Sequence, residues 1–167
     1  MTVLFHAIPT EDAARLRNGG TDAYDRLPEI LISDGHGYPC RHCLSNIAAG
    51  DEVLVLAYRP FPALQPYAET GPIFLHRKPC PRYEASEVLP PILDSPDYIV
   101  RGYGRDDRIV YGTGAVTPTE GIRDRAEELL ARDDIAYAHI RSARNNCYQC
   151  RVEKVEAPTF SDTGSGI

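Results

Sequence analysis

The clearest evidence about the fold comes from the stretch Ile135-Ala-Tyr-Ala-His-Ile-Arg-Ser-Ala-Arg-Asn-Asn-Cys-Tyr-Gln-Cys-Arg-Val152. Its two ends are rich in residues that favour strands, and the polar segment between them contains two consecutive asparagines. Asparagine tolerates the left-handed backbone conformations that tight loops require. We therefore predict two antiparallel strands, 135–141 and 147–155, joined by a five-residue loop at 142–146.

The length of this loop also predicts which side chains share a face of the sheet, because side chains alternate along a strand. A five-residue loop would give the pairs Arg141 with Cys147, His139 with Gln149 and Tyr137 with Arg151. In this register Cys147 lies on a polar face and Cys150 on an apolar one. A straight strand cannot aim both thiols at a single ion. The CxxC spacing of Cys147 and Cys150 is therefore, by itself, weak evidence for a shared metal site.

Other short apolar runs between glycines and prolines predict further strands. They cover residues 3–8, 53–58, 73–76, 98–103 and 108–116, the last two forming a hairpin around Gly104 to Asp107. The proline-rich segment 59–72 is expected to be an ordered loop.

One helix is well marked. Thr117-Pro-Thr-Glu120 has the pattern of a capping box with proline at the first helical position. An apolar stripe follows at helical spacing, formed by Ile122, Ala126, Leu129 and Leu130. A second helix is predicted to begin at Thr10 and end at Gly19, and a helical turn is predicted at 40–47.

These elements predict the α+β fold class, with a mainly antiparallel sheet, one well-defined helix and one or two short helices. We expect one domain over residues 1–156 and a weakly ordered tail over 157–167. The chain has 167 residues, net charge −6 and no run of basic residues, which argues against nucleic acid as a partner. No signal peptide or membrane span is apparent, so a cytoplasmic location without membrane contact is the expectation.

Five cysteines are the most informative residues for function. Four form the pairs Cys40-Arg-His-Cys43 and Cys147-Tyr-Gln-Cys150, and the fifth follows a histidine in His76-Arg-Lys-Pro-Cys80. In a reducing compartment such pairs serve as metal ligands, redox thiols or buried free thiols more often than as disulfides. Zinc is the expected cofactor if a metal is bound, because thiolate and imidazole are its preferred ligands.

The sequence contains more candidate Cys and His ligands than one zinc site needs. One quartet joins the two CxxC pairs, and the other combines Cys40 and Cys43 with His76 and Cys80. A structural role as small buried hydrophobes is the simplest alternative for several of these thiols. A CxxC redox centre is a further possibility, with Arg41 and His42 adding positive character beside Cys40.

Two other kinds of site remain open. Cys147 could act as a nucleophile with His139 as its base, although no third group that would orient the base is visible. Arg41, Arg141 and Arg151, with Arg101 and Arg144, could bind a small anionic ligand. Arginines of this kind more often pair with surface acids, and the chain has 24 aspartates and glutamates.

Several short motifs resemble those of the bacterial family known as domain of unknown function 1203. They are Tyr38-Pro-Cys-Arg41 with Leu44, Gly71-Pro-Ile-Phe74, Arg101-Gly-Tyr103, His139-Ile-Arg-Ser-Ala143, Cys147-Tyr148 and Arg151-Val152. The resemblance spans most of the chain and implies no reaction. The family pattern includes Cys40 and Cys147 but does not require Cys43, Cys80 or Cys150, so it implies that a role for the CxxC pairs belongs to a subgroup.

The sequence thus favours a non-enzymatic domain with a structural zinc site. The alternatives are a small enzyme or anion-binding module that uses His139, Arg141 and Cys147, and a CxxC thiol redox protein.

Overall fold

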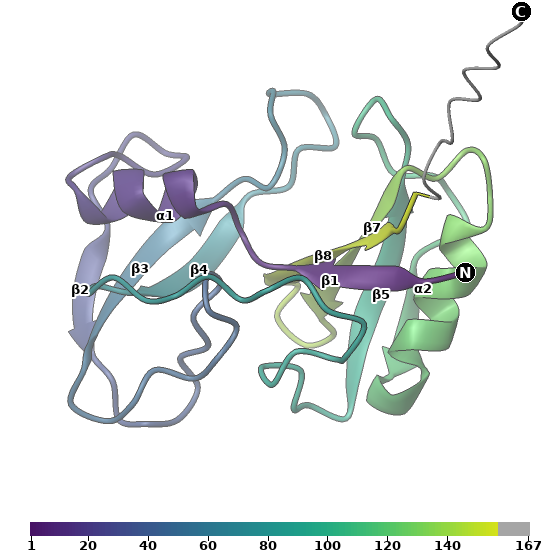
Figure 1. The fold of residues 1–167 in the computed structure, drawn as a ribbon. Coiled ribbons are helices and arrows are strands. Elements are labelled where there is room, and N and C mark those ends of the chain that lie inside the picture. Colours follow the sequence, from purple (N-terminus) through teal and green to yellow (C-terminus); the bar gives the residue numbers. More distant parts are fainter. Residues whose placement is uncertain (157–167) are drawn as a thin grey trace, which may run out of the picture.

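The computed structural model describes residues 1–156 and contains two antiparallel sheets that lie side by side (Figure 1). The larger sheet has the strand order β1-β8-β7-β5-β6, and the smaller one has the order β2-β3-β4. The predicted α+β class is confirmed, but the strands divide between two sheets. The predicted tail at 157–167 lies outside the described residues.

The elements have the following bounds. The larger sheet contains β1 (Val3–His6), β5 (Asp97–Tyr103), β6 (Ala115–Pro118), β7 (Tyr137–Ser142) and β8 (Tyr148–Lys154). The smaller sheet contains β2 (Glu29–Ile32), β3 (Glu52–Tyr58) and β4 (Gly71–His76). The helices are α1 (Thr10–Arg17) and α2 (Ile122–Leu130), the latter preceded by the 3-10 turn Thr119–Gly121. No helix in this described part of the chain is long and apolar enough to cross a membrane.

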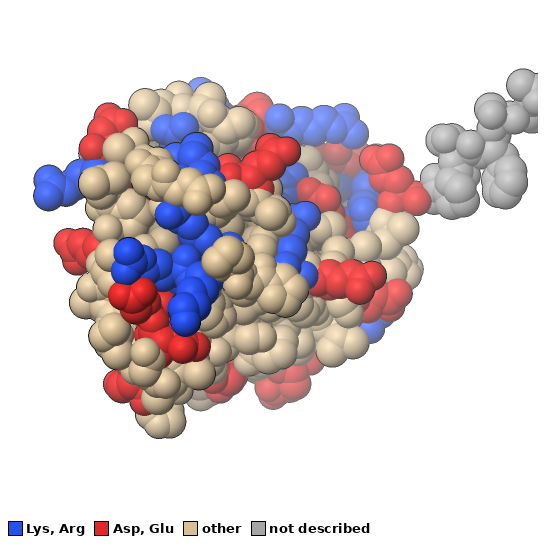
Figure 2. Space-filling view, turned by 60° about the vertical axis from the view of Figure 1, so that its left-hand side comes forward, with Lys and Arg blue, Asp and Glu red and all other residues tan. Residues whose placement is uncertain are grey.

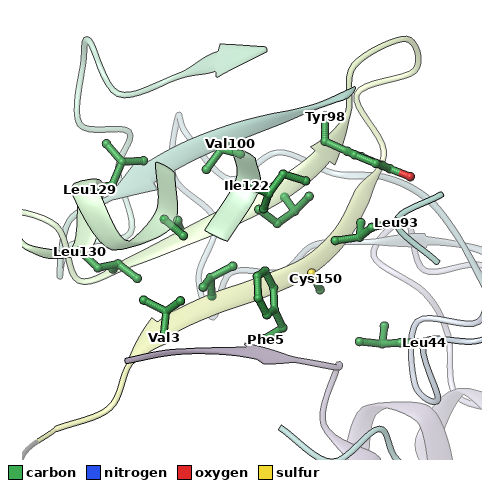
Figure 3. Close-up of a cluster of buried hydrophobic side chains, with 14 of the residues drawn as sticks. Val3, Phe5, Leu44, Leu93, Tyr98, Val100, Ile122, Leu129, Leu130 and Cys150 are labelled. Atoms are coloured by element: carbon green, nitrogen blue, oxygen red, sulfur yellow. The ribbon is translucent and has the colours of Figure 1, made fainter. Parts of the chain in front are cut away.

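Helix α2 covers one face of the larger sheet and encloses the main apolar core (Figure 3). The four residues of its predicted apolar stripe are all buried, as the helical spacing requires: Ile122, Ala126, Leu129 and Leu130. Alternating residues of the strands meet them from the sheet, among them Val3, Phe5, Val100, Ile140 and Cys150. This core therefore follows directly from the 3.6-residue period of the helix and the two-residue period of the strands.

The predicted start of this helix is wrong. Thr117 lies in β6, where it pairs with Tyr98, and no side chain caps either Thr119–Gly121 or α2. Pairing with β5 takes the segment into the sheet and delays the helix to Ile122. The hairpin between β5 and β6 is confirmed at its turn, where the Gly104 N–H donates to the Arg108 carbonyl (3.0 Å). The second strand is displaced towards the C-terminus of the predicted range.

The predicted register of the last hairpin is also wrong: it is displaced by one residue at Arg141, which pairs with Tyr148 rather than Cys147, and by a second residue beyond a bulge at Gln149. Arg141 pairs with Tyr148, while Ile140 pairs with Cys150, so one residue of β8 is left without a partner. A bulge shifts the following side chains to the opposite face. Tyr148 therefore joins His139 and Arg151 on the face away from α2, and Cys150 lies beneath the helix.

Two features of the smaller sheet were not predicted. Strand β2 is an edge strand whose four residues are all exposed, so it lacks the alternation that marks a half-buried strand. The segment predicted as a helical turn at 40–47 is an irregular turn flanked by the isolated bridge of Pro39 with Asn46. Helix α1 itself is confirmed and is followed by Asn18 and Gly19, but Thr10, expected to cap it, is its first residue; Pro9 is the N-cap, and no side chain caps the helix.

The packing beneath α2 predicts a large difference between two neighbouring positions. Leu130→Ala should lower the free energy of unfolding by about 2–5 kcal/mol, because it removes a fully buried side chain and leaves a cavity. Glu128→Ala, on the exposed side of the helix, should change it by no more than about 0.5 kcal/mol. Chemical denaturation of both variants measures the difference, and equal losses would contradict the assigned orientation of α2.

Candidate metal centre

The centre begins with a tight turn that contains Cys40 and Cys43. The Cys40 N–H donates to the Ser45 carbonyl (2.9 Å), and the Leu44 N–H donates back to the Cys40 carbonyl (2.9 Å). The Arg41 N–H donates to the Phe74 carbonyl of β4 (3.0 Å), which fixes the turn beside that strand. A reversal of this kind allows residues i and i+3 to aim at one point, which a straight strand does not.

Leu44 provides the unusual backbone conformation that this turn needs. Its φ of 52° lies in the left-handed region, which costs a residue with a β-carbon about 1–2 kcal/mol and which glycine adopts freely. The Leu44 side chain is fully buried in the main apolar core, at the end of the cluster away from α2 (Figure 3), and this burial offsets the strain. Leucine rather than glycine at this position therefore does not prevent the turn.

The other two residues come from the end of β4 and the segment that follows it. His76 is the last residue of β4, and Cys80 lies four positions later, where the chain leaves the smaller sheet. The Tyr83 N–H donates to the His42 carbonyl (2.9 Å), which holds this segment against the turn. Two stretches far apart in sequence thus meet at one place.

The candidate ligand atoms of Cys40, Cys43, His76 and Cys80 all lie within 4.8 Å of one another. The Sγ atoms of Cys40 and Cys80 are 3.8 Å apart, and Cys43 Sγ is 3.5 Å from His76 Nδ1. Tetrahedral coordination with Zn–S of about 2.3 Å and Zn–N of about 2.0 Å requires separations of about 3.8 Å and about 3.5 Å. These four side chains could therefore hold a metal ion, and the second sequence-based quartet is the one that the structure brings together.

Polar neighbours orient the ligand side chains. Arg17 donates from Nη2 to Cys80 Sγ (3.0 Å) and from Nε to the His76 carbonyl (2.9 Å). His42 is within hydrogen-bond distance of Cys80 Sγ through Nδ1 (3.3 Å) and of the Thr10 hydroxyl through Nε2 (3.0 Å). Such outer contacts commonly fix the geometry and charge of metal ligands.

The protonation of the three thiols is strongly coupled. Hydrogen bonds from Cys43 and Cys80 hold the pKa of the Cys40 thiol well below its ordinary value. The same hydrogen bonds, together with burial, raise the pKa values of the Cys43 and Cys80 thiols. Three thiolates at these distances would repel one another strongly, so a cation among them is needed for all three to ionise together.

The remaining two cysteines lie outside this group. Cys150 is fully buried among apolar side chains, and burial raises its pKa to about 12. Cys147 lies just before β8, and its thiol donates to the Asn145 carbonyl (3.6 Å). Cys147 and Cys150 therefore lie in different surroundings, as predicted, although the predicted strand register is wrong.

The structure does not form the predicted nucleophile and base pair. His139 is fully buried, and neither of its ring nitrogens has a hydrogen-bond partner within residues 1–156. Four aromatic rings surround its imidazole, those of Phe61, Tyr103, Tyr137 and Tyr148. Cys147 is thus not hydrogen-bonded to His139, and the geometry for base-assisted attack is missing.

The three arginines predicted to bind a ligand have different environments. Arg41 is buried and donates to the backbone carbonyls of Pro39 (2.6 Å) and Tyr148 (2.6 Å); burial lowers its pKa to about 10, which leaves it charged at neutral pH. Arg141 lies 3.3 Å from a Glu69 carboxylate oxygen. Only Arg151 borders a cavity, where it also stacks on the Tyr137 ring. The three therefore do not form one anion site.

Sequence reasoning did not identify Arg17, Thr10 or His42 as neighbours of the candidate centre. His42 was considered only as a positive residue beside Cys40, yet burial lowers its pKa and favours the neutral imidazole. The position of His42 between Cys40 and Cys43 was the indication in the sequence that it lies near the candidate centre. Arg17 and Thr10 reach the site through the packing of α1, which local sequence does not encode.

Comparison with known proteins gives one match. A family model described as Protein of unknown function (DUF1203) matches residues 37–154, which include the whole candidate centre. No curated protein and no solved structure matches the chain.

Because Leu44 has a left-handed conformation, we expect the usual order of stability of an alanine and a glycine variant to be reversed at this position. Glycine is ordinarily less stable than alanine, but at a positive φ it should be the more stable by about 1 kcal/mol. Leu44→Gly should therefore unfold at higher denaturant concentration than Leu44→Ala. Ile47, which is equally buried but has no positive φ, provides the control: there the alanine variant should be the more stable. The same order at both positions would contradict the strained turn.

Proposed function

The chain belongs to the DUF1203 family of proteins of unknown function, and we propose that Cys40, Cys43, His76 and Cys80 bind one structural zinc ion in it. The observation that carries this proposal is the convergence of three sulfurs and one imidazole nitrogen within 4.8 Å of one another, with the Cys40–Cys80 and Cys43–His76 distances at tetrahedral values. Thiolate and imidazole donors select zinc over the hard, oxygen-seeking cations.

The donor set supports a structural rather than a catalytic ion. Four protein ligands complete the usual tetrahedral shell of zinc, whereas catalytic zinc keeps one position for water or substrate. Three thiolates and one divalent cation leave a net charge of −1, and the Arg17 guanidinium beside Cys80 neutralises it. A closed, neutralised centre stabilises the fold without a reacting position.

The position of the centre explains what the ion would stabilise. The turn contacts the β1–α1 connection through the Ile8 N–H and the Arg41 carbonyl (3.1 Å), and it reaches β8 of the larger sheet through Arg41. Cys80 lies where the chain leaves the smaller sheet, and this segment continues along the front of the molecule towards the larger one (Figure 1). The ion would therefore stabilise the junction between the two sheets.

We therefore propose a non-enzymatic, zinc-stabilised domain. The alternative of a catalytic Cys147 lacks its base, and the redox alternative lacks a helix N-terminus at Cys40, which lies in an irregular turn. The metal centre is the function that the residues support best.

Metal content is the first test. Protein purified without a histidine tag should contain about one zinc ion per chain, measured by elemental mass spectrometry. Cys43→Ala should lower that content several-fold, because three remaining ligands bind zinc more weakly. Cys147→Ala is the matched control and should retain the ion. Protein without zinc, or equal loss of zinc from both variants, would contradict the proposal.

Thiol reactivity is an independent test. In the metal-loaded folded protein, a thiol reagent should label Cys147 rapidly and Cys43 and Cys80 slowly, because a zinc-bound thiolate is a shielded nucleophile. A chelator should increase the labelling rate of Cys43 and Cys80 and leave that of Cys147 unchanged. Peptide mass spectrometry assigns each rate to its residue. Equal rates at Cys43 and Cys147 before chelation would refute metal protection.

A further inference from the structure

A cavity of about 780 Å³ lies between the two sheets, on the side of the larger sheet that α2 does not cover. Its walls come from the β1–α1 connection, α1, the loop after β3 and the exposed face of β7 and β8. Cavities of this size at the junction of two structural units are the usual place for a small ligand. The metal centre does not line it.

The inner wall of the cavity is aromatic. The rings of Tyr58, Phe61 and Tyr148 line it, and we refer to these three residues as the aromatic wall. Tyr148 faces the cavity only because the bulge at Gln149 turns it to the side of His139. Phe61 and Tyr148 are 4% and 6% exposed, so Tyr58 presents most of the flat apolar surface on which a planar group can pack.

His139 also borders the cavity, behind Phe61 and Tyr148. Its side chain is 0% exposed, and both ring nitrogens lack partners within the described part of the chain. Burial and nearby arginines hold its pKa well below the ordinary value, so the imidazole is neutral, with one donor and one acceptor nitrogen. A buried polar group without partners is costly and marks a place where another molecule can supply them.

The cavity also has an excess of available N–H donors. Arg15 and Arg59 each use one nitrogen on a backbone carbonyl, those of Thr21 (2.8 Å) and Phe61 (3.1 Å). Among the arginines of the cavity, Arg151 is the one that forms an ion pair within residues 1–156, with Glu153. Arg15 and Arg59 thus keep free N–H groups that suit a carboxylate.

The cavity is lined by four carboxylates and four arginines, and every one of these carboxylates except that of Asp25 accepts a hydrogen bond or ion pair from the described part of the protein. Asp22 accepts hydrogen bonds from three backbone N–H groups, and Asp12 accepts one from the Tyr58 hydroxyl (3.2 Å). Glu153 pairs with Arg151 and lies 3.7 Å from His6 Nε2. Figure 2 shows Lys and Arg side chains gathered on one face of the molecule, with acidic side chains beside them, although the net charge is −6. Within the cavity, the N–H groups that Arg15 and Arg59 do not use on backbone carbonyls are the ones available to an anion.

We propose that this cavity binds a small planar organic acid, whose carboxylate is held by Arg15 and Arg59 and whose ring packs on the aromatic wall. The carboxylate end explains the unpaired guanidinium groups, and the planar body explains the aromatic surface. This site is independent of the proposed zinc ion, because the two share no residue.

Calorimetric titration with naphthoate and naphthamide tests the proposal. Both probes have the same flat ring system, but only naphthoate carries a charge. Naphthoate should bind one molecule per chain at least about tenfold more tightly than naphthamide. Equal affinities, or no saturable binding of naphthoate, would overturn the proposal. Inorganic phosphate that binds as tightly as naphthoate would overturn the role of the aromatic wall.

Variants locate the binding. The double substitution Arg15→Met and Arg59→Met should weaken naphthoate binding at least about tenfold while leaving naphthamide binding unchanged. Arg132→Met is the matched control, because this arginine pairs with Asp134 on the surface. An unchanged affinity for naphthoate in the double variant would refute the site. Circular dichroism of each variant shows that the fold is retained, and the zinc content, measured in parallel, reports the metal centre separately.

Discussion

The burial of Leu44 in the main apolar core is the interaction on which the rest of this structure depends. It holds the residue after Cys43 in a left-handed conformation that a leucine rarely adopts, and the strain is offset by apolar surface removed from water. With the turn closed, the thiols of Cys40 and Cys43 face His76 and Cys80. The core of the larger sheet thus supports a site that belongs to the smaller sheet.

A single extra residue in β8 gives the larger sheet two different faces. The bulge at Gln149 turns Cys150 towards α2 and Tyr148 towards His139. One face is therefore a continuous apolar core, and the other combines aromatic rings with arginines around a cavity. Without the bulge, Tyr148 and Cys150 would lie on the same face of the sheet, so one of them would lose its present place.

Local sequence was sufficient for the parts of the fold that depend on periodicity. The apolar stripe of α2 and the strand at 53–58 follow from the spacing of their apolar residues; both elements are confirmed, although in β3 only Val53, Leu54 and Leu56 are buried. The start of α2 was wrong because the β6 ladder competes with the capping pattern at Thr117. Strand β2 was missed because its residues are exposed and carry no core-facing pattern.

By itself, the sequence determined the fold class, the apolar face of α2 and the set of residues from which a metal centre could be built. It left two quartets open, because spacing along the chain does not say which distant segments meet. The tertiary structure selected Cys40, Cys43, His76 and Cys80 by placing the turn beside β4, and it turned Tyr148 towards His139 through the bulge in β8. Both results depend on contacts between segments far apart in sequence, and such contacts are set by the packing of the two sheets rather than by local preference.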